Sequence, residues 1–150
     1  MEKYILLIED NPGDIELTRR ALTKGKISNR LVVVEDGQEA LNYLFRTGKF
    51  AADPPRPLPT LTLLDLKLPL IDGLEVLARI RSSELTRRMP VVILTSSVEE
   101  TDLCTSYDLG VNSYIRKPVD FTHFACAIQS LGLYWLELNQ PPDEEMVPNE

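Results

Sequence analysis

Cysteine and histidine are scarce in this sequence, with two and one among 150 residues. One histidine and two scattered thiols lack the spacing of a zinc site, which excludes the nitrogen and sulfur ligand sets of zinc proteins. Cys104 and Cys126 both fall in stretches with helical periodicity. We expect them to be small apolar residues at buried or half-buried positions rather than the two halves of a disulfide.

Long apolar runs and an excess of positive charge are also missing. No stretch approaches the roughly 20 apolar residues that cross a membrane, so no membrane association is expected. Lys and Arg number 16 against 23 Asp and Glu, and the net charge of −7 argues against DNA as a partner because it repels a phosphate backbone. Residues 1–4 lack the parts of a secretion signal, which predicts a cytoplasmic location.

The sequence is instead rich in short apolar runs that alternate with amphipathic stretches. The runs expected to be strands are residues 4–8, 31–34, 60–64, 91–94 and 113–115. The first run is continuous rather than alternating, as in a strand that is covered on both faces. The pattern predicts an α/β fold, a flavodoxin-like (βα)5 doubly wound parallel sheet with strand order 2-1-3-4-5.

Capping residues and prolines mark the boundaries of the expected elements. The expected helix starts are Asn11 with Pro12, Asp36 with Glu39, and Ser97 with Glu100. Prolines at positions 54, 55, 57 and 59 predict a stiff, extended loop before the third strand. We expect one domain over residues 1–138, with a last helix over residues 120–138, and an acidic, disordered tail over residues 139–150.

Polar side chains follow the expected strands at the points where these end. They are Glu9 and Asp10, Asp65, Thr95 and Lys117. The carboxyl ends of parallel strands meet at one edge of a sheet, and strands one and three are neighbours in the expected order, which brings the three acids together. Clustered carboxylates repel one another, and oxygen ligands of this kind suit Mg²⁺.

An acidic pair after the first expected strand, an Asp after the third, a Thr after the fourth and a Lys-Pro after the fifth resemble the pattern of response-regulator receiver domains. The resemblance covers about residues 3–138. It implies that Asp65 accepts a phosphoryl group from a histidine kinase. It also implies that Mg²⁺ is held by Glu9, Asp10, Asp65 and the backbone carbonyl of Lys67. The chain would then be a signalling phosphoacceptor in a two-component phosphorelay, not an enzyme that acts on other substrates.

The resemblance also assigns roles to three further side chains. Lys117 would pair with the phosphate, and Thr95 would move to bind a phosphate oxygen. Tyr114 would be the aromatic switch that turns inward when Thr95 moves. The Lys117–Pro118 peptide would be cis and would aim the lysine.

Two features narrow the resemblance to the response regulators of bacterial phytochrome histidine kinases. One is the long proline-rich loop over residues 48–59, and the other is the extended last helix. They imply a stand-alone receiver whose upstream partner is a phytochrome kinase. Its output would be a contact with another protein through the fourth helix, fifth strand and fifth helix. The downstream partner is not indicated.

The length of the last helix has a separate consequence. Nineteen residues rise about 28 Å, whereas a five-residue strand spans only about 17 Å. The final turns are therefore expected to project and to leave apolar side chains partly uncovered. These are Tyr134, Trp135, Leu136 and Leu138, and they predict a homodimer interface.

Three alternatives compete with a phosphorylated receiver. A haloacid-dehalogenase-like phosphatase requires a second Asp two residues after the nucleophile, and that position is Lys67. A nucleotide- or flavin-binding domain requires a phosphate loop after the first strand, where Glu9 and Asp10 stand instead. A pseudo-receiver that scaffolds a partner without phosphorylation stays open, although the polar residues at the strand ends argue against it.

Overall fold

The computed structural model describes residues 2–118 and 120–142 of the chain. Its strands are β1 (Tyr4–Ile8), β2 (Arg30–Val34), β3 (Leu61–Leu64), β4 (Val91–Thr95) and β5 (Ser113–Arg116). Its α-helices are α1 (Pro12–Lys24), α2 (Gly37–Phe45), α3 (Gly73–Ser82), α4 (Glu100–Asp108) and α5 (Phe121–Leu133). Two shorter helical segments are η1 (Gly48–Phe50) and η2 (Tyr134–Leu138).

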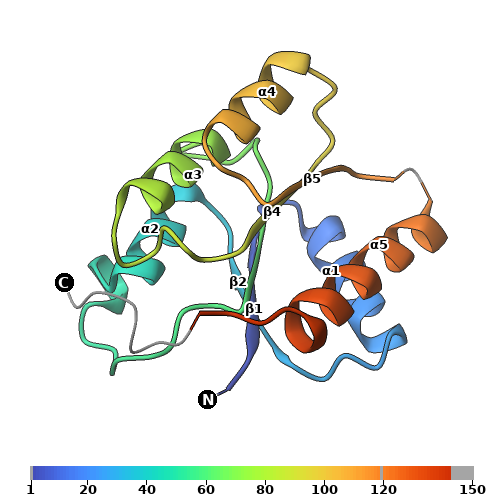
Figure 1. Ribbon diagram of the computed structural model, residues 1–150, viewed down its shortest axis with the longest axis horizontal. Coiled ribbons are helices and arrows are strands. Elements are labelled where there is room, and N and C mark those ends of the chain that lie inside the picture. The colour runs from blue at the N-terminus through green and yellow to red at the C-terminus, as the bar shows by residue number, and fades with distance from the viewer. Residues whose placement is uncertain (1, 119, 143–150) are drawn as a thin grey trace.

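The five strands form one parallel sheet in the order β2-β1-β3-β4-β5. Helices α1 and α5 cover one face, and α2, α3 and α4 lie on the other side (Figure 1). The predicted architecture and strand order are therefore confirmed. Strand order reverses between β1 and β3, which is the point where open α/β sheets bind ligands.

Two hydrophobic cores lie on opposite faces of the sheet, and β1 contributes to both. Leu6 and Ile8 pack with the residues of α2 and α3, whereas Ile5 and Leu7 pack with those of α1 and α5. Every residue of β1 is buried. This double burial explains why the strand is a continuous apolar run and holds the end of β1 rigidly.

Helix starts follow the predicted caps in two of the three cases. The side chain of Asn11 caps α1, and that of Asp36 caps α2 by accepting a hydrogen bond from the Glu39 backbone N–H at 2.6 Å. The prediction for Ser97 was wrong, because α4 begins three residues later and its N-cap makes no side-chain hydrogen bond. The Ser97 hydroxyl binds Asp102 instead, at 2.6 Å.

The proline-rich loop is fastened to α2 by Arg56 and to β1 by Tyr4. The guanidinium carbon of Arg56 lies 3.9 Å from the centre of the Tyr43 ring, and its nitrogens bind the Tyr43 carbonyl at 2.7 Å and Asp53 at 3.1 Å. The Tyr4 hydroxyl donates to the Pro57 carbonyl at 2.7 Å. The loop is extended over its prolines, but its first residues form the short helix η1.

The last helix departs from its prediction. The α-helix ends at Leu133, and residues Tyr134–Leu138 form a π-helical turn. This turn places Leu136 in the core, with 4% of its surface exposed, and the Lys3 ammonium binds its carbonyl at 2.8 Å. The prediction that Leu136 is uncovered was wrong, because this turn packs its Leu136 side chain against the α1–α5 core instead of projecting from the domain. Tyr134 and Leu138 are exposed, and Trp135 is half-buried against the core.

The two cysteines differ from the expectation in their exposure. Cys104 and Cys126 are free thiols as predicted, but both are exposed, because they lie on the outer faces of α4 and α5.

None of the helices within the described ranges is long and apolar enough to span a membrane. The expected disorder of the tail concerns mainly residues 143–150, which lie outside the described residues.

Candidate phosphoacceptor site

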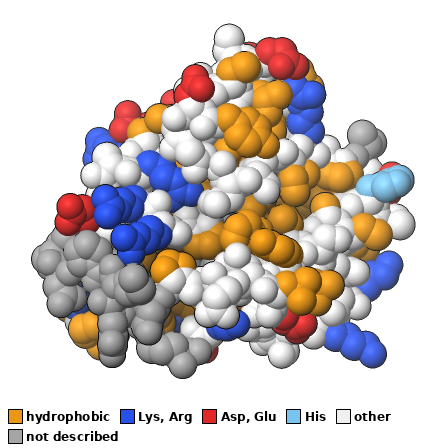
Figure 2. Space-filling model, viewed as in Figure 1, with side chains coloured by type: hydrophobic (Ala, Val, Ile, Leu, Met, Phe, Trp, Pro, Cys, Tyr) orange, Lys and Arg blue, Asp and Glu red, His pale blue; other side chains and the backbone are white. Residues whose placement is uncertain are grey.

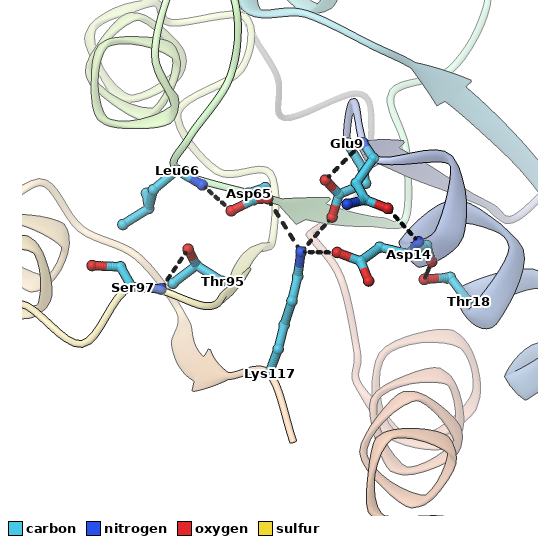
Figure 3. A network of polar contacts seen from close by, with 9 residues as sticks. Glu9, Asp14, Thr18, Asp65, Leu66, Thr95, Ser97 and Lys117 are labelled. Atoms are coloured by element: carbon cyan, nitrogen blue, oxygen red, sulfur yellow. Dashed lines mark hydrogen bonds and ion pairs between the residues drawn. The ribbon is translucent and has the colours of Figure 1, made fainter. Parts of the chain in front are cut away.

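The predicted site residues converge at one edge of the sheet, where the carboxyl ends of the strands lie. Glu9 follows β1, Asp65 follows β3, Thr95 ends β4 and Lys117 follows β5. Glu9, Asp65 and Thr95 are buried. Figure 3 shows the carboxylates of Glu9 and Asp65 directed toward the Lys117 ammonium group, with the Thr95 hydroxyl bonded to Ser97 beside them.

Lys117 forms ion pairs with three carboxylates at once. Its Nζ lies 2.6 Å from Glu9 Oε1, 2.7 Å from Asp14 Oδ2 and 3.2 Å from Asp65 Oδ2. Burial on its own lowers the pKa of Lys117, but the hydrogen bonds to Asp14 and Glu9 outweigh burial and raise the pKa above its ordinary value. The lysine is therefore a permanent positive charge at the centre of the site.

Asp14 is the residue of this centre that the sequence pattern did not predict. It lies in the first turn of α1, not at a strand end, and that is why a search of strand ends missed it. The helix begins only three residues after Glu9, so its first turn stays at the same edge of the sheet. An acidic residue in the first turn after a strand-end acid was the available signal.

Glu9 is an acid whose environment disfavours its charge. Burial raises the pKa of Glu9 to about 7, and the nearby negative charge of Asp65 adds to the rise, while the hydrogen bond from Lys117 opposes it. Its second carboxylate oxygen accepts a hydrogen bond from the Asn11 backbone N–H at 3.3 Å. Protonation of Glu9 is therefore accessible close to neutral pH.

The acids also provide a set of oxygens suited to a divalent cation. Glu9, Asp10 and Asp65 each offer one carboxylate oxygen, and these oxygens all lie within 4.8 Å of one another. Asp10 is exposed, which leaves the set open to solvent on one side. Oxygen ligands with open positions for water fit a hard divalent cation. Lys67 is exposed two residues after Asp65, and coordination by its carbonyl stays a prediction.

The Asp65 carboxylate is oriented by the backbone of the residue that follows it. Its Oδ1 accepts a hydrogen bond from the Leu66 N–H at 2.7 Å, which leaves Oδ2 facing Lys117. A side chain at Gly73 would collide with the backbone of Asp65 and Leu66. Glycine at this position therefore allows α3 to begin directly beside the carboxylate.

Thr95 and Tyr114 lie on neighbouring strands but in different environments. Thr95 Oγ1 accepts a hydrogen bond from the Ser97 N–H at 3.2 Å (Figure 3). The Tyr114 ring packs against the core on the α2–α3 side, and its hydroxyl oxygen is buried without a hydrogen bond among the described residues. Burial raises the pKa of Tyr114. The switch role of Tyr114 stays a prediction.

The expected cis peptide at Lys117–Pro118 was wrong. The described residues contain no cis peptide bond, so this bond is trans, the form that X–Pro bonds favour by about 0.5–1 kcal/mol. The position of Lys117 is fixed instead by its backbone N–H, which donates to the Thr95 carbonyl at 2.8 Å. The lysine therefore reaches the acids from the residue directly after β5, where its backbone still bonds to β4.

The fold defines a class of signalling domain, together with the acids, the threonine and the lysine that lie at the carboxyl edge of its sheet. Residues 5–129 match the response regulator receiver domain family, and the chain belongs to this family. Receivers are signalling phosphoacceptors of two-component systems and not enzymes in the ordinary sense. Membership shows that the phosphatase and the nucleotide-binding alternatives were wrong.

Particular relatives are similar to the chain over almost its whole length. Rcp1 of Synechocystis sp., a response regulator, is 38% identical over 90% of this chain and 90% of its own. The structure of the phosphorylated cyanobacterial phytochrome response regulator RcpA is 40% identical and superposes with a TM-score of 0.86, covering 95% of this chain and 100% of that one. The bacteriophytochrome response regulator RtBRR is 53% identical with a TM-score of 0.76, covering 97% and 87%.

Proposed function

We propose that Asp65 accepts a phosphoryl group from the phosphohistidine of a sensor kinase. One observation carries the proposal: the buried Asp65 carboxylate turns one oxygen toward Lys117, at 3.2 Å, and lies within the cluster of acids suited to a cation. An Asp65 oxygen would bond to phosphorus as the phosphorus–nitrogen bond breaks, and the electron pair of that bond would return to the imidazole. Lys117 would balance charge on the phosphoryl oxygens, and Thr95 would bind one of them.

The cation in this proposal is Mg²⁺, held by Glu9, Asp10 and Asp65, with the Lys67 carbonyl as a further ligand. When bound, it would offset negative charge on the phosphoryl group. Support comes from the oxygen-only ligand set and from the structure of related Rcp1, which is described as its Mn²⁺-bound form. The same site would assist hydrolysis of the phosphoryl group but would act on no other substrate.

The upstream partner in this proposal is a histidine kinase of the bacterial phytochrome class. RcpA and RtBRR, both similar to this chain over most of its length, are response regulators of phytochromes. Purified phytochrome kinase should phosphorylate this protein faster than a histidine kinase of another class at equal concentration. Equal rates from the two kinases would contradict this choice of partner.

In this proposal the protein signals through a contact with another protein. It also forms a homodimer through exposed apolar residues at the end of α5. Figure 2 shows hydrophobic side chains gathered on one face over the region between α4 and α5. At the end of α5, Leu133 is 51%, Tyr134 49% and Leu138 67% exposed. We call these three residues the C-terminal patch. Exposed apolar clusters of this kind favour an interface.

Intact-mass measurement after incubation with acetyl phosphate tests the central proposal. Wild type should gain one phosphoryl adduct that requires Mg²⁺, resists acid and is lost in base, whereas Asp65→Asn should gain none. Asp108→Asn, an exposed Asp at the end of α4, is the matched control and should behave like wild type. Absence of any adduct in wild type would favour a pseudo-receiver that works without phosphorylation.

A further inference from the structure

Asp14 contributes a carboxylate that belongs neither to a strand end nor to the cation set. Its Oδ2 lies 2.7 Å from Lys117 Nζ, and the cluster of oxygens suited to a cation consists of Glu9, Asp10 and Asp65. The Lys117 side chain is 10% exposed in this pair and that of Asp14 is 28% exposed. The pair is therefore largely shielded from solvent, where ion pairs are stronger than on an open surface.

The backbone around Asp14 fixes where its side chain points. The Asn11 side chain accepts a hydrogen bond from the Asp14 N–H at 3.0 Å, and the buried Thr18 hydroxyl donates to the Asp14 carbonyl at 2.8 Å. Both bonds hold the first turn of α1 in place. The carboxylate is thereby directed toward Lys117 (Figure 3).

The three ion pairs of Lys117 are unequal. An ammonium group has three N–H donors, so each carboxylate can take one. Glu9 and Asp14 are bound at 2.6 and 2.7 Å, whereas Asp65 lies at 3.2 Å. Asp65 Oδ2 is thus the least engaged of the three oxygens, as a nucleophile requires.

We propose that Asp14 is a positioning residue that holds Lys117 off Asp65 until the phosphoryl group arrives. This inference rests on the phosphoacceptor role proposed for Asp65. Glu9 belongs to the candidate cation set and Asp14 does not, so Asp14 is the carboxylate that can keep Lys117 whether or not a cation is present. Without Asp14, the ammonium would pair more closely with Asp65 and mask the attacking oxygen.

A purely structural role makes a different prediction. An acid in the first turn of a helix stabilises the helix through its dipole, and Glu16, on the same helix, offers a matched control. Glu16 is exposed, and no ion pair between it and Lys117 occurs in the described structure. Asp14→Asn and Glu16→Gln remove the same charge from α1, and only the first removes a partner of Lys117.

The first test measures the rate of Asp65 phosphorylation by acetyl phosphate at saturating Mg²⁺. Asp14→Asn should slow it by about 3- to 10-fold, which corresponds to roughly 0.7–1.4 kcal/mol, and Asp14→Glu should restore part of the rate. Glu16→Gln should stay within about two-fold of wild type. In a Lys117→Met background, Asp14→Asn should have no further effect. An equal effect in that background, or equal effects of Asp14→Asn and Glu16→Gln, would overturn the proposal.

The second test needs neither phosphate nor metal. Urea unfolding of the metal-free protein gives a double-mutant cycle for Asp14→Asn and Lys117→Met. The change in midpoint caused by Asp14→Asn should shrink at least about two-fold when Lys117 is already replaced. Strict additivity would overturn the proposal even if wild type is phosphorylated. Failure of wild type to gain an adduct would instead refute the phosphoacceptor role of Asp65. The double-mutant cycle would still report whether Asp14 and Lys117 are coupled in the unphosphorylated protein.

Discussion

The ammonium group of Lys117 lies closer to Glu9, at 2.6 Å, than to Asp65, at 3.2 Å. The lysine thus binds most closely an acid that is also a candidate cation ligand. A bound cation and the lysine would both be attracted to the negative charge of this carboxylate and would repel each other. Occupancy of the cation site and the position of Lys117 are therefore coupled through Glu9.

Cation binding should weaken as pH falls toward and below 7. Burial raises the pKa of Glu9 to about 7, and a protonated carboxyl is a poor ligand because a cation must first displace the proton. Calorimetric titration with Mg²⁺ should show affinity falling between pH 8 and pH 6, approaching about ten-fold per pH unit below the pKa. Glu9→Gln should bind more weakly and lose most of this dependence; identical pH profiles would contradict the assignment.

The same pKa shift has the opposite consequence for the stability of the metal-free protein. The pKa of Glu9 is higher when folded, about 7, than its ordinary value of 4.5, so the folded state binds the proton more tightly. Stability from this group is full below about pH 4.5 and is lost as pH rises through about 7. Urea unfolding across this window should show the decline in wild type, and Glu9→Gln should lack it. A wild-type curve parallel to that of the variant would refute this linkage.

Ser97 should connect the proposed phosphorylation site to helix α4. Its hydroxyl donates to Asp102 at 2.6 Å and accepts from the Glu99 N–H at 3.3 Å, while its own N–H binds Thr95. Ser97→Ala should lower the free energy of unfolding by about 0.5–1.5 kcal/mol because it removes the hydrogen bonds of a buried hydroxyl to Asp102 and to the Glu99 N–H. Hydrogen exchange at the start of α4 should accelerate.

Ser82→Ala is the control for this prediction. Ser82 is exposed and donates one hydrogen bond, to the Arg79 carbonyl at 3.2 Å. Its replacement should change the free energy of unfolding by less than about 0.5 kcal/mol. Equal losses in the two variants, or unchanged exchange in α4, would show that Ser97 does not connect the site to the helix.

Arg56 should be irreplaceable by lysine in the proline-rich loop. Its guanidinium stacks on Tyr43 while binding the Tyr43 carbonyl and Asp53, and a lysine cannot make these contacts together. Arg56→Lys should lower the free energy of unfolding by about 1–2 kcal/mol. In Arg79→Lys, at an exposed ion pair with Glu75, the loss should be below about 0.5 kcal/mol. Denaturant titration of both variants measures the difference, and equal losses would mean that the loop is held by other contacts.

Much of the fold could be predicted because strands that are buried on both faces consist of apolar residues without interruption. A strand such as β1 has no solvent-facing residue, so its sequence is a continuous apolar run. The strand-end residues Glu9, Asp65, Thr95 and Lys117 could be placed together because parallel strands all end at one edge. The convergence of these four residues at one edge of the sheet therefore follows from topology.

What escaped prediction depends on local geometry that periodicity does not record. Asp14 reaches Lys117 because α1 begins immediately beyond Glu9, and the direction of its side chain depends on the cap. Leu136 lies in the core, in a π-helical turn that follows the α-helix after Leu133. The length of a regular helix predicted that this residue would project, and it does not record such a local change of structure.

The C-terminal patch should control self-association. Leu133 and Leu138 are 51% and 67% exposed, whereas Leu136 lies in the core, so truncation of the last turns would also damage folding. Paired substitution of Leu133 and Leu138 by Glu avoids this problem and places charge in the proposed interface. Sedimentation velocity should show a dimer for wild type and a monomer for the double variant.

Leu70→Glu provides the control for this last prediction. Leu70 is 80% exposed in the turn between β3 and α3, outside the C-terminal patch, so the substitution places one such charge at an open position elsewhere on the protein. The dimer should survive it, because charge disrupts association where apolar surface is buried between subunits. A wild-type monomer at all concentrations would exclude the dimer. A dimer that persists in the Leu133 and Leu138 double variant would place the interface elsewhere, with the α4–β5–α5 face as the next surface to test.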